Sequence, residues 1–379
     1  MLAKVALNGE NPDLHAAHSR DAAFANRAAS LARSKTQRGL VKRFLAAGAG
    51  CAALVGLCAA VAFAAKTGSG SSAGTGRVFL PNPVADLQDQ SLTDMKDADY
   101  AGLQPAYHTV QLTNLDGSGF LRGDYANVVG ETGNPAYSPT NTFSYNRHQD
   151  EFEQVMAYYW ITEAQKYIQS LGFGSGRFGP INKESQDVRI DQWGQDNSFE
   201  TDRPKDELRF GKGGVDDAED AEVILHEYGH AMQVDQSAAF YTSNEAGAIG
   251  EGFADYWAVT VSDVVSPTPD EACVADWDST SYTSTTPHCL RRVDTNLRYP
   301  TDLTGEEHHD GQIWSRALWD IRNALGHTVA DTVILDAQFD FPGTTMPELA
   351  QRTLAAAQAL YGTRAANTVS RAFQARGIL

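Results

Sequence analysis

A stretch of 22 residues without a charged side chain, residues 44–65, divides this chain and limits what either side of it can fold into. Its length is enough to cross a lipid bilayer as a helix. Lys42 and Arg43 directly before it would stay on the cytoplasmic side. It ends in Ala62-Phe63-Ala64, a pattern that a signal peptidase cuts. We therefore expect a cleaved signal peptide or an uncleaved membrane anchor, with the main fold formed by the residues that follow.

The charge differs sharply between the two sides of this segment. Residues 1–43 carry eight Lys or Arg and three Asp or Glu, a net charge of +5, whereas the whole chain of 379 residues carries −18. The remainder is therefore at −23 and strongly acidic. An acidic surface repels phosphate, which excludes nucleic acid as a partner. On either interpretation of residues 44–65, this acidic body lies outside the cytoplasm.

Two cysteines of the acidic body have a spacing that suits a disulfide. Cys273 and Cys289 have 15 residues between them, and exported proteins meet an oxidising environment. A bond that closes this loop would add roughly 3 kcal/mol of stability. We expect the disulfide, with two free thiols as the alternative.

Hydrophobic patterning predicts that the body is β-rich first and helical later. Short apolar runs between glycine-marked turns favour strands over 78–147 and 177–215. Apolar residues three and four apart favour a helix at about 148–171. Further helices are expected at about 217–235, 245–263, 309–325, 346–361 and 363–376. The predicted parts are a basic region, the apolar segment, a Gly/Ser linker, a β-rich lobe and a helical lobe, at residues 1–43, 44–65, 66–77, 78–235 and 236–379.

One predicted helix carries a pair of histidines suited to a metal. His226 and His230 lie one turn apart on the same face, and Glu227 directly follows the first. Two imidazoles in this arrangement can bind one Zn²⁺, while the carboxylate reaches the water that the metal activates. The alternative is an ordinary helix that contains these residues by chance. Zinc would need a third protein ligand from elsewhere.

A second predicted helix offers that ligand. Glu251 and Asp255 are four residues apart, so both face the same way. Glu251 would bind zinc through oxygen. Asp255 would accept the other ring N–H of a ligand histidine and fix its tautomer. A solvated carboxylate is the alternative for Glu251, and Glu245 is the alternative ligand.

Together, HEYGH at 226–230 and GEGFAD at 250–255 resemble the gluzincin zinc metallopeptidases, in the thermolysin-like and fungalysin-like families. The resemblance implies a two-lobed α+β fold: a β-rich N-terminal lobe, a mainly helical C-terminal lobe and an active-site cleft between them. It implies hydrolysis of peptide bonds in a protein or peptide substrate. His226, His230 and Glu251 would hold one Zn²⁺, and Glu227 would be the general base.

Two further segments extend the resemblance. DNSFE, at 196–200, is similar to the family's edge strand, where Asn197 and Ser198 would pair with the substrate backbone. An ordinary loop is the alternative. EEHHDGQIW resembles the segment that supplies an oxyanion-binding histidine. Counting back from its Gly-x-Ile-Trp part assigns this role to His308, with His309 as the alternative.

The resemblance also assigns roles to an arginine and a tyrosine, and a group of acidic residues has two interpretations. CLRRVDTNLRY resembles the substrate-binding arginine segment, which assigns Arg291 to a substrate carbonyl; Arg292 or a surface salt bridge are the alternatives. Thermolysin-like enzymes have an oxyanion-binding tyrosine where this chain has Thr242, and Tyr241 next to it would help His308. The acids from Asp216 to Glu222 are either favourable charges at a helix N-terminus or a Ca²⁺ site.

The sequence therefore predicts an extracytoplasmic zinc endopeptidase, secreted or anchored in the membrane through residues 44–65. A different class of function stays open, namely a catalytically inactive binding module displayed at the cell envelope on a metallopeptidase scaffold. These families are made with a long folding propeptide, whereas residues 66–77 alone join the apolar segment to the body, which favours the alternative. The presence of Glu227 favours the enzyme.

Overall fold

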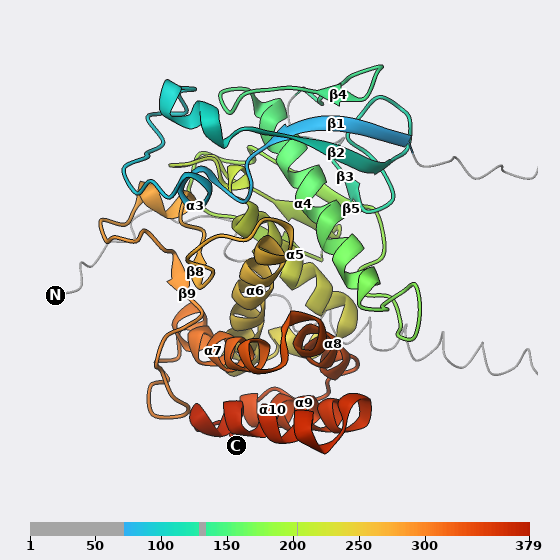
Figure 1. Cartoon of the computed structure of the whole chain (residues 1–379), viewed down its shortest axis with the longest axis vertical. Coiled ribbons are helices and arrows are strands. Elements are labelled where there is room, and N and C mark those ends of the chain that lie inside the picture. Colours follow the sequence, from blue (N-terminus) through green and yellow to red (C-terminus); the bar gives the residue numbers. More distant parts are fainter. Residues whose placement is uncertain (1–71, 129–133, 203) are drawn as a thin grey trace, which may run out of the picture. The chain divides into compact units, whose positions relative to one another are not determined.

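Strands come early in the described chain and long helices come late (Figure 1). The computed structural model describes residues 72–128, 134–202 and 204–379. In these ranges no helix is long and apolar enough to cross a membrane. The signal peptide or anchor predicted at 44–65 lies outside the described residues and stays a prediction.

The strands of the described residues form three small sheets. One has the order β2-β1-β4, another has the order β3-β5-β7-β6 with β6 at its edge, and β8 pairs with β9 alone. The strands are β1 Ser72–Val78, β2 His108–Leu115, β3 Ala126–Asn127, β4 Thr142–Phe143, β5 Gln186–Arg189, β6 Phe199–Thr201, β7 Glu207–Arg209, β8 Cys273–Val274 and β9 Arg291–Arg292.

The helices follow the predicted order with two additions, α3 within the range predicted as strands and α8. They are α3 Pro83–Leu87, α4 Asp150–Ser170, α5 Ala221–Gln236, α6 Asn244–Val265, α7 Glu307–Leu325, α8 His327–Gln338, α9 Met346–Tyr361 and α10 Thr363–Ala375, with the short 3-10 helices η1 Ala101–Ala106, η2 Asp217–Glu219, η3 Ala238–Tyr241 and η4 Asp278–Ser281. We did not predict α8, whose Thr, Val and Ile residues have low helix propensity. Its burial against α7 and α9 overrides that preference.

Helix α4 forms the centre of the β-rich half. Most of its residues are buried, polar ones such as Gln165 among them, and Phe152, Val155 and Trp160 are fully buried. It packs against β1 and β2 on one side and against α5 on another, as the ribbon shows (Figure 1). This burial provides a fixed support for α5, the helix that carries both histidines.

The predicted linker at 66–77 is wrong from Ser72 onward, because β1 begins there and pairs antiparallel with β2. Its glycines are needed for close packing. A Cβ at Gly76 would lie 2.7 Å from Cγ1 of Val155 on α4, and one at Gly74 would lie 2.3 Å from the carbonyl oxygen of Asn141. The small residues that suggest flexibility in the sequence therefore allow the strand to approach its neighbours.

The predicted α+β class is confirmed. Seven of the nine strands in the described ranges lie before α5, and the chain after α5 is mainly helical. The exception is the β8–β9 pair, which the predicted disulfide reinforces: Cys273 and Cys289 are bonded, with an S–S distance of 2.04 Å. This pair lies between α6 and α7 in the chain and carries Arg291.

Candidate metal centre and active-site cleft

Helix α5 presents three polar side chains from a buried position. It begins at Asp220, whose carboxylate accepts the backbone N–H of Glu222 at 3.0 Å and so caps the helix. His226, Glu227 and His230 are all less than 10% exposed. The opposite face of the helix is held by α4, since Gln165 of α4 donates to the hydroxyl of Tyr228 at 2.6 Å. The histidine face is thus directed away from α4.

Helix α6 brings Glu251 to these histidines through a close helix–helix approach. A Cβ on Gly229 of α5 would lie 3.1 Å from Cα of Ala254 on α6, so a larger residue would push the helices apart. Ser243 caps α6 by accepting the backbone N–H of Ala246 at 3.1 Å. Glu245, the alternative ligand, instead accepts the backbone N–H of Met346 at 2.7 Å.

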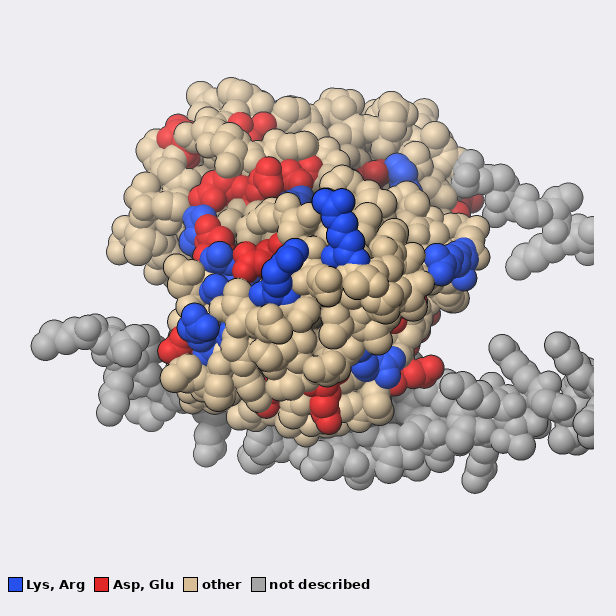
Figure 2. Space-filling model, turned by 60° about the horizontal axis from the view of Figure 1, so that its bottom comes forward, with Lys and Arg blue, Asp and Glu red and all other residues tan. Residues whose placement is uncertain are grey.

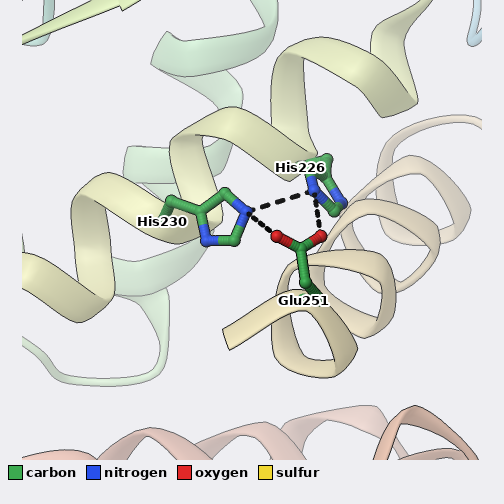
Figure 3. Close-up of side chains that lie close together, drawn as sticks. All are labelled: His226, His230 and Glu251. Carbon is green, nitrogen blue, oxygen red and sulfur yellow. Dashed lines mark hydrogen bonds and ion pairs between the residues drawn. The ribbon is translucent and has the colours of Figure 1, made fainter. Parts of the chain in front are cut away.

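The three predicted metal ligands converge on one point (Figure 3). Nε2 of His226 lies 3.2 Å from Nε2 of His230 and 3.2 Å from Oε2 of Glu251, and Nε2 of His230 lies 3.5 Å from Oε1 of Glu251. Donor atoms at about 2.0–2.1 Å from a tetrahedral zinc are themselves about 3.3 Å apart. The observed separations therefore fit this ion without rearrangement of the helices.

The two histidines differ in their protonation. Burial lowers the pKa of His230 to about 4, so its ring is neutral at pH 7 and offers a lone pair. Burial also disfavours the charged form of His226, but hydrogen bonds with Asp255 and Glu251 outweigh it and raise its pKa to about 10. Because metal ligands must be deprotonated, metal binding at this site would release a proton.

Asp255 lies behind His226 in a buried ion-pair chain. Its Oδ1 is 2.9 Å from Nδ1 of His226. Both of its oxygens accept from Arg291, Oδ2 from Nε and Oδ1 from Nη2, each at 2.7 Å. Burial disfavours the ionised form of Asp255, yet Arg291 and His226 outweigh it and lower its pKa to about 2. Asp255 is therefore an ionised acceptor that directs Nε2 of His226 toward the ligand cluster.

Glu227 lies beside this cluster with its carboxyl group removed from solvent. Burial, followed by the charge of Glu251, raises its pKa to about 7, although His226 and Arg291 oppose the shift. The backbone N–H of Glu200, on edge strand β6, donates a hydrogen bond to the Glu227 carboxylate. A carboxyl group with a pKa near 7 can both accept and release a proton at neutral pH.

Helix α7 adds His308 at the other side of Glu251. Nε2 of His308 is 3.4 Å from Oε2 of Glu251, and its Nδ1 is 2.7 Å from Oε1 of Glu306. This approach depends on two glycines, because a Cβ on Gly252 of α6 would lie 2.2 Å from the carbonyl oxygen of Gly311 on α7. His309 instead has its Nδ1 3.1 Å from Oδ1 of Asp310. Of the two candidates, the structure brings His308 to the cluster.

A cleft of about 440 Å³ runs past these groups. Its lining includes His226, Glu227, Arg291 and His308 together with Asn197 and Ser198, the residues that precede β6. Asp196, Asp217 and Asp278 also line it. Figure 2 shows that acidic side chains gather in a hollow on one face of the protein.

Two predicted site residues have contacts that the sequence did not indicate. The ring centroid of Tyr241, on η3, lies 6.4 Å from that of His230, and its hydroxyl donates to Oε2 of Glu200 at 3.4 Å. Arg291 does line the cleft, but its Nε and Nη2 bind Asp255. Arg292 pairs with Asp270 and is separate from the cluster.

Sequence reasoning missed two parts of the site. Glu306 both caps α7, by accepting the backbone N–H of His309 at 2.7 Å, and orients the ring of His308. The sequence gives no clear signal for this role, because glutamate is not a preferred N-cap residue and the predicted helix begins at about 309. The backbone N–H of Glu200 leaves no signal in the sequence, because any residue but proline supplies one.

Two histidines on one helix, a glutamate on the next and a carboxyl group beside them form the arrangement that the sequence predicts for a metallopeptidase site. Residues 210–340, which include all four, match the model of the family described as Fungalysin metallopeptidase (M36). This match confirms the predicted resemblance over residues 210–340.

A solved structure with some similarity is "Precursor of Protealysin, Metalloproteinase from Serratia proteamaculans", at 16% identity and a TM-score of 0.46. That match covers 60% of this chain and 79% of that one. No curated protein matches this chain.

Proposed function

We propose that this chain is an extracytoplasmic zinc endopeptidase. The observation that carries the proposal is the ligand cluster itself: the donor atoms of His226, His230 and Glu251 are 3.2–3.5 Å apart, with Glu227 adjacent in the same cleft. Three protein ligands leave a fourth zinc position open, which is typical of catalytic rather than structural zinc.

Zinc held by these residues would act as a Lewis acid and lower the pKa of a water molecule toward 7. Glu227 accepts a proton from the attacking water and later delivers a proton to the leaving amine. Its pKa of about 7, raised by burial, suits both transfers near neutral pH. Asp255 keeps His226 in the tautomer that directs Nε2 at the metal.

His308 is the group proposed to stabilise the negative oxygen that develops on the scissile carbonyl. Its Nδ1 is held by Glu306, so its Nε2 is directed toward the cluster. Tyr241 would support this oxygen only after its hydroxyl leaves Glu200. A donor aimed at developing charge contributes about 3–4 kcal/mol to the transition state.

An extended peptide is the proposed substrate. In the described part of the sheet, β6 is the edge strand, with β7 as its neighbour. Asn197 and Ser198 line the cleft directly before it. Backbone pairing with such an edge holds a peptide without regard to most of its side chains. Arg291 would reach a substrate carbonyl from its place in the cleft lining while it remains paired with Asp255.

The location outside the cytoplasm is supported by the Cys273–Cys289 bond, because disulfides persist in oxidising compartments. Residues 44–65 would act as a signal peptide or as an anchor, which makes the enzyme secreted or membrane-attached. Proteins or peptides of the same compartment are the proposed substrates, and nucleic acid is not.

The decisive experiment compares full-length wild type with Glu227→Gln. Zinc per chain is measured by plasma mass spectrometry, and cleavage of denatured casein is measured with and without a chelator. We expect one zinc in both proteins, chelator-sensitive cleavage by wild type, and at least a hundredfold loss in the variant. Glu163→Gln, the same change on the outer face of α4, should retain full activity.

Zinc binding without cleavage by wild type would support the alternative, a binding module on this scaffold. A folded protein without zinc would refute the metal assignment. Cleavage by Glu227→Gln at the rate of wild type would refute the proposed base.

A further inference from the structure

The inner wall of the cleft carries two acidic side chains that the proposed mechanism does not use. Asp217, on η2, and Asp278, on η4, line the same cleft as Glu227. They are 2% and 4% exposed, so they belong to the inner wall and not to the rim. One oxygen from each lies within 4.8 Å of the other and of an oxygen of the exposed Asp196, which also lines the cleft. Negative charge is thus gathered next to the groups proposed to cleave the peptide.

Each of the two buried carboxylates has one oxygen with a partner and one without. Oδ2 of Asp217 accepts a hydrogen bond from the hydroxyl of Ser198. Oδ2 of Asp278 accepts one from the hydroxyl of Tyr282 at 3.0 Å. Oδ1 of each aspartate is buried and has no hydrogen-bond partner. Because buried oxygens of proteins are nearly always paired, two unpaired ones on one cleft wall indicate a partner that arrives with a ligand.

Glu222, a third acid of the lining, shows what a carboxylate with a purely structural role looks like. Its Oε1 accepts from the hydroxyl of Ser262 at 2.7 Å, and its Oε2 accepts from the backbone N–H of Ala275 at 2.7 Å. Both oxygens are therefore satisfied within the fold. The acids Asp217 and Asp278 lie in the same lining and are not satisfied in this way.

The arginine of the cleft does not neutralise the two aspartates. Arg291 is the one Lys or Arg among the residues that line the cleft. Its Nε and Nη2 donate to the carboxylate of Asp255, each at 2.7 Å. A guanidinium held by two hydrogen bonds in this way is committed to that partner. The inner wall therefore keeps an excess of negative charge.

The pKa values of the two aspartates reflect this excess. Burial raises the pKa of Asp217 to about 8, and the charges of Asp196 and Glu227 add to the shift. Burial, followed by the charge of Asp217, raises the pKa of Asp278 well above its ordinary value. A cation that arrives between them would favour the ionised form of both groups. The influence of Glu227 on Asp217 also shows that this acidic wall lies close to the proposed base.

Apolar side chains line the cleft together with these acids. They are Val223, Ala275 and Leu290. Val223 lies on α5 one turn before Glu227, so both belong to the same face of that helix. An apolar wall beside buried carboxylates suits a side chain with a hydrocarbon stem and a cationic end, as in lysine and arginine. An uncharged aliphatic side chain would leave both carboxylates without a partner.

We propose that Asp217 and Asp278 select substrates with a lysine or arginine directly beside the scissile bond. This inference rests on the proposed function, because it names the substrate class of the same cleft. The stem of the selected side chain would lie along Val223 and Leu290, and its ammonium or guanidinium would bind the two free Oδ1 atoms. Since Val223 is one turn from Glu227, the selected residue flanks the bond that is cleaved. Asp196 at the rim would attract the cation on its way in.

The test uses the zinc-loaded full-length chain and three peptides that differ at one position, which holds lysine, norleucine or glutamate. Norleucine has the four-carbon stem of lysine without the charge. The ratio of kcat/KM is measured between peptides, and mass spectrometry locates the cleaved bond. We expect cleavage next to lysine, with a preference of at least about 30-fold over norleucine, and no cleavage next to glutamate.

Variants show whether this preference comes from the aspartates. Asp217→Asn should lower the ratio of lysine to norleucine at least tenfold, and Asp217→Leu should reverse it in favour of norleucine. Glu163→Gln removes the same charge from the outer face of α4 and should keep the ratio of wild type. Because each ratio is taken within one protein, a variant that is less active overall still gives a valid result. Asp278→Asn provides the comparison if the Asp217 variants do not fold.

The proposal is overturned if wild type cleaves the lysine and norleucine peptides equally well, or if neither aspartate variant changes the ratio. Failure of the proposed function looks different, because wild type would then cleave no peptide and no casein. In that case the Kd of the same peptides for the zinc-loaded chain, measured by fluorescence anisotropy, decides the question. Binding of the lysine peptide at least tenfold more tightly than the norleucine peptide would support the acidic wall as a cation site, and equal affinities would overturn it.

Discussion

Substituting Asp255 by Asn separates the effect of this residue on zinc from its effect on folding. The asparagine retains an oxygen that can accept the Nδ1 proton of His226, but it removes the negative charge. That charge is shared between His226, at 2.9 Å, and Arg291, at 2.7 Å. Arg291 would then be a buried cation whose nearest remaining acid is Glu251, with Oε2 at 4.0 Å.

The expected magnitudes follow from these contacts. Loss of a carboxylate that orients a ligand histidine lowers metal affinity about 10- to 100-fold. Removal of one partner of a buried ion pair costs about 3–5 kcal/mol of stability. The retained acceptor oxygen and the nearby Glu251 reduce this to about 2–3 kcal/mol, which corresponds to a Tm decrease of roughly 5–10 °C.

The assay pairs zinc titration against a competing chelator with thermal unfolding of the zinc-free protein. Asp263→Asn is the matched control, because Asp263 lies on the same helix and pairs with the buried Arg322. It should lose comparable stability and keep the zinc affinity of wild type. If Asp255→Asn lowered the Tm and left zinc affinity unchanged, Asp255 would be a structural partner of Arg291 and the orienting role would be refuted.

Three further predictions concern other parts of the protein. His308→Ala should lower kcat about 10²- to 10³-fold without loss of zinc, and His309→Ala should leave kcat unchanged; equal effects would contradict the assignment. Reduction of the Cys273–Cys289 bond should lower the free energy of unfolding by roughly 3 kcal/mol in a denaturant titration. Burial raises the pKa of Asp276 to about 8, so its favourable contribution is present below about pH 4 and is lost as pH rises through 8. The Tm of Asp276→Asn minus the Tm of wild type should therefore increase by at least 5 °C between pH 5 and pH 9. A Tm difference that stays constant over this range would contradict the raised pKa.

The local features of this fold could be predicted from the sequence because they repeat over short distances. Residues at i and i+4 on a helix lie on the same face, so the spacing on α5 and α6 predicts which side chains point the same way. In the structure His226, His230 and Glu251 lie together, as this spacing predicts. The spacing of two cysteines was enough to predict their bond, which is confirmed. Patterning likewise placed most long helices within a few residues of their observed ends.

Features that depend on contacts between distant segments could not be predicted in this way. The glycines of β1 indicate a linker until Val155 and Asn141 are seen against them. Arg291 has no sequence signal for its pairing with Asp255, 36 residues earlier. Nothing in the sequence near Asp217 shows that it lies within reach of Asp278.

The glycine contacts between helices determine which parts of the site can move independently. Gly229 against α6 and Gly252 against α7 allow close backbone approach, so α5, α6 and α7 pack as one tightly joined group. The metal ligands and His308 belong to that group, whereas β6 pairs with β7 and is joined to α5 through the backbone N–H of Glu200. Adaptation to substrates of different bulk is therefore available through displacement of β6, while the distances among the metal ligands stay constant. Laboratory evolution of cleavage preference should accordingly concentrate its mutations around β6 and spare all three helices.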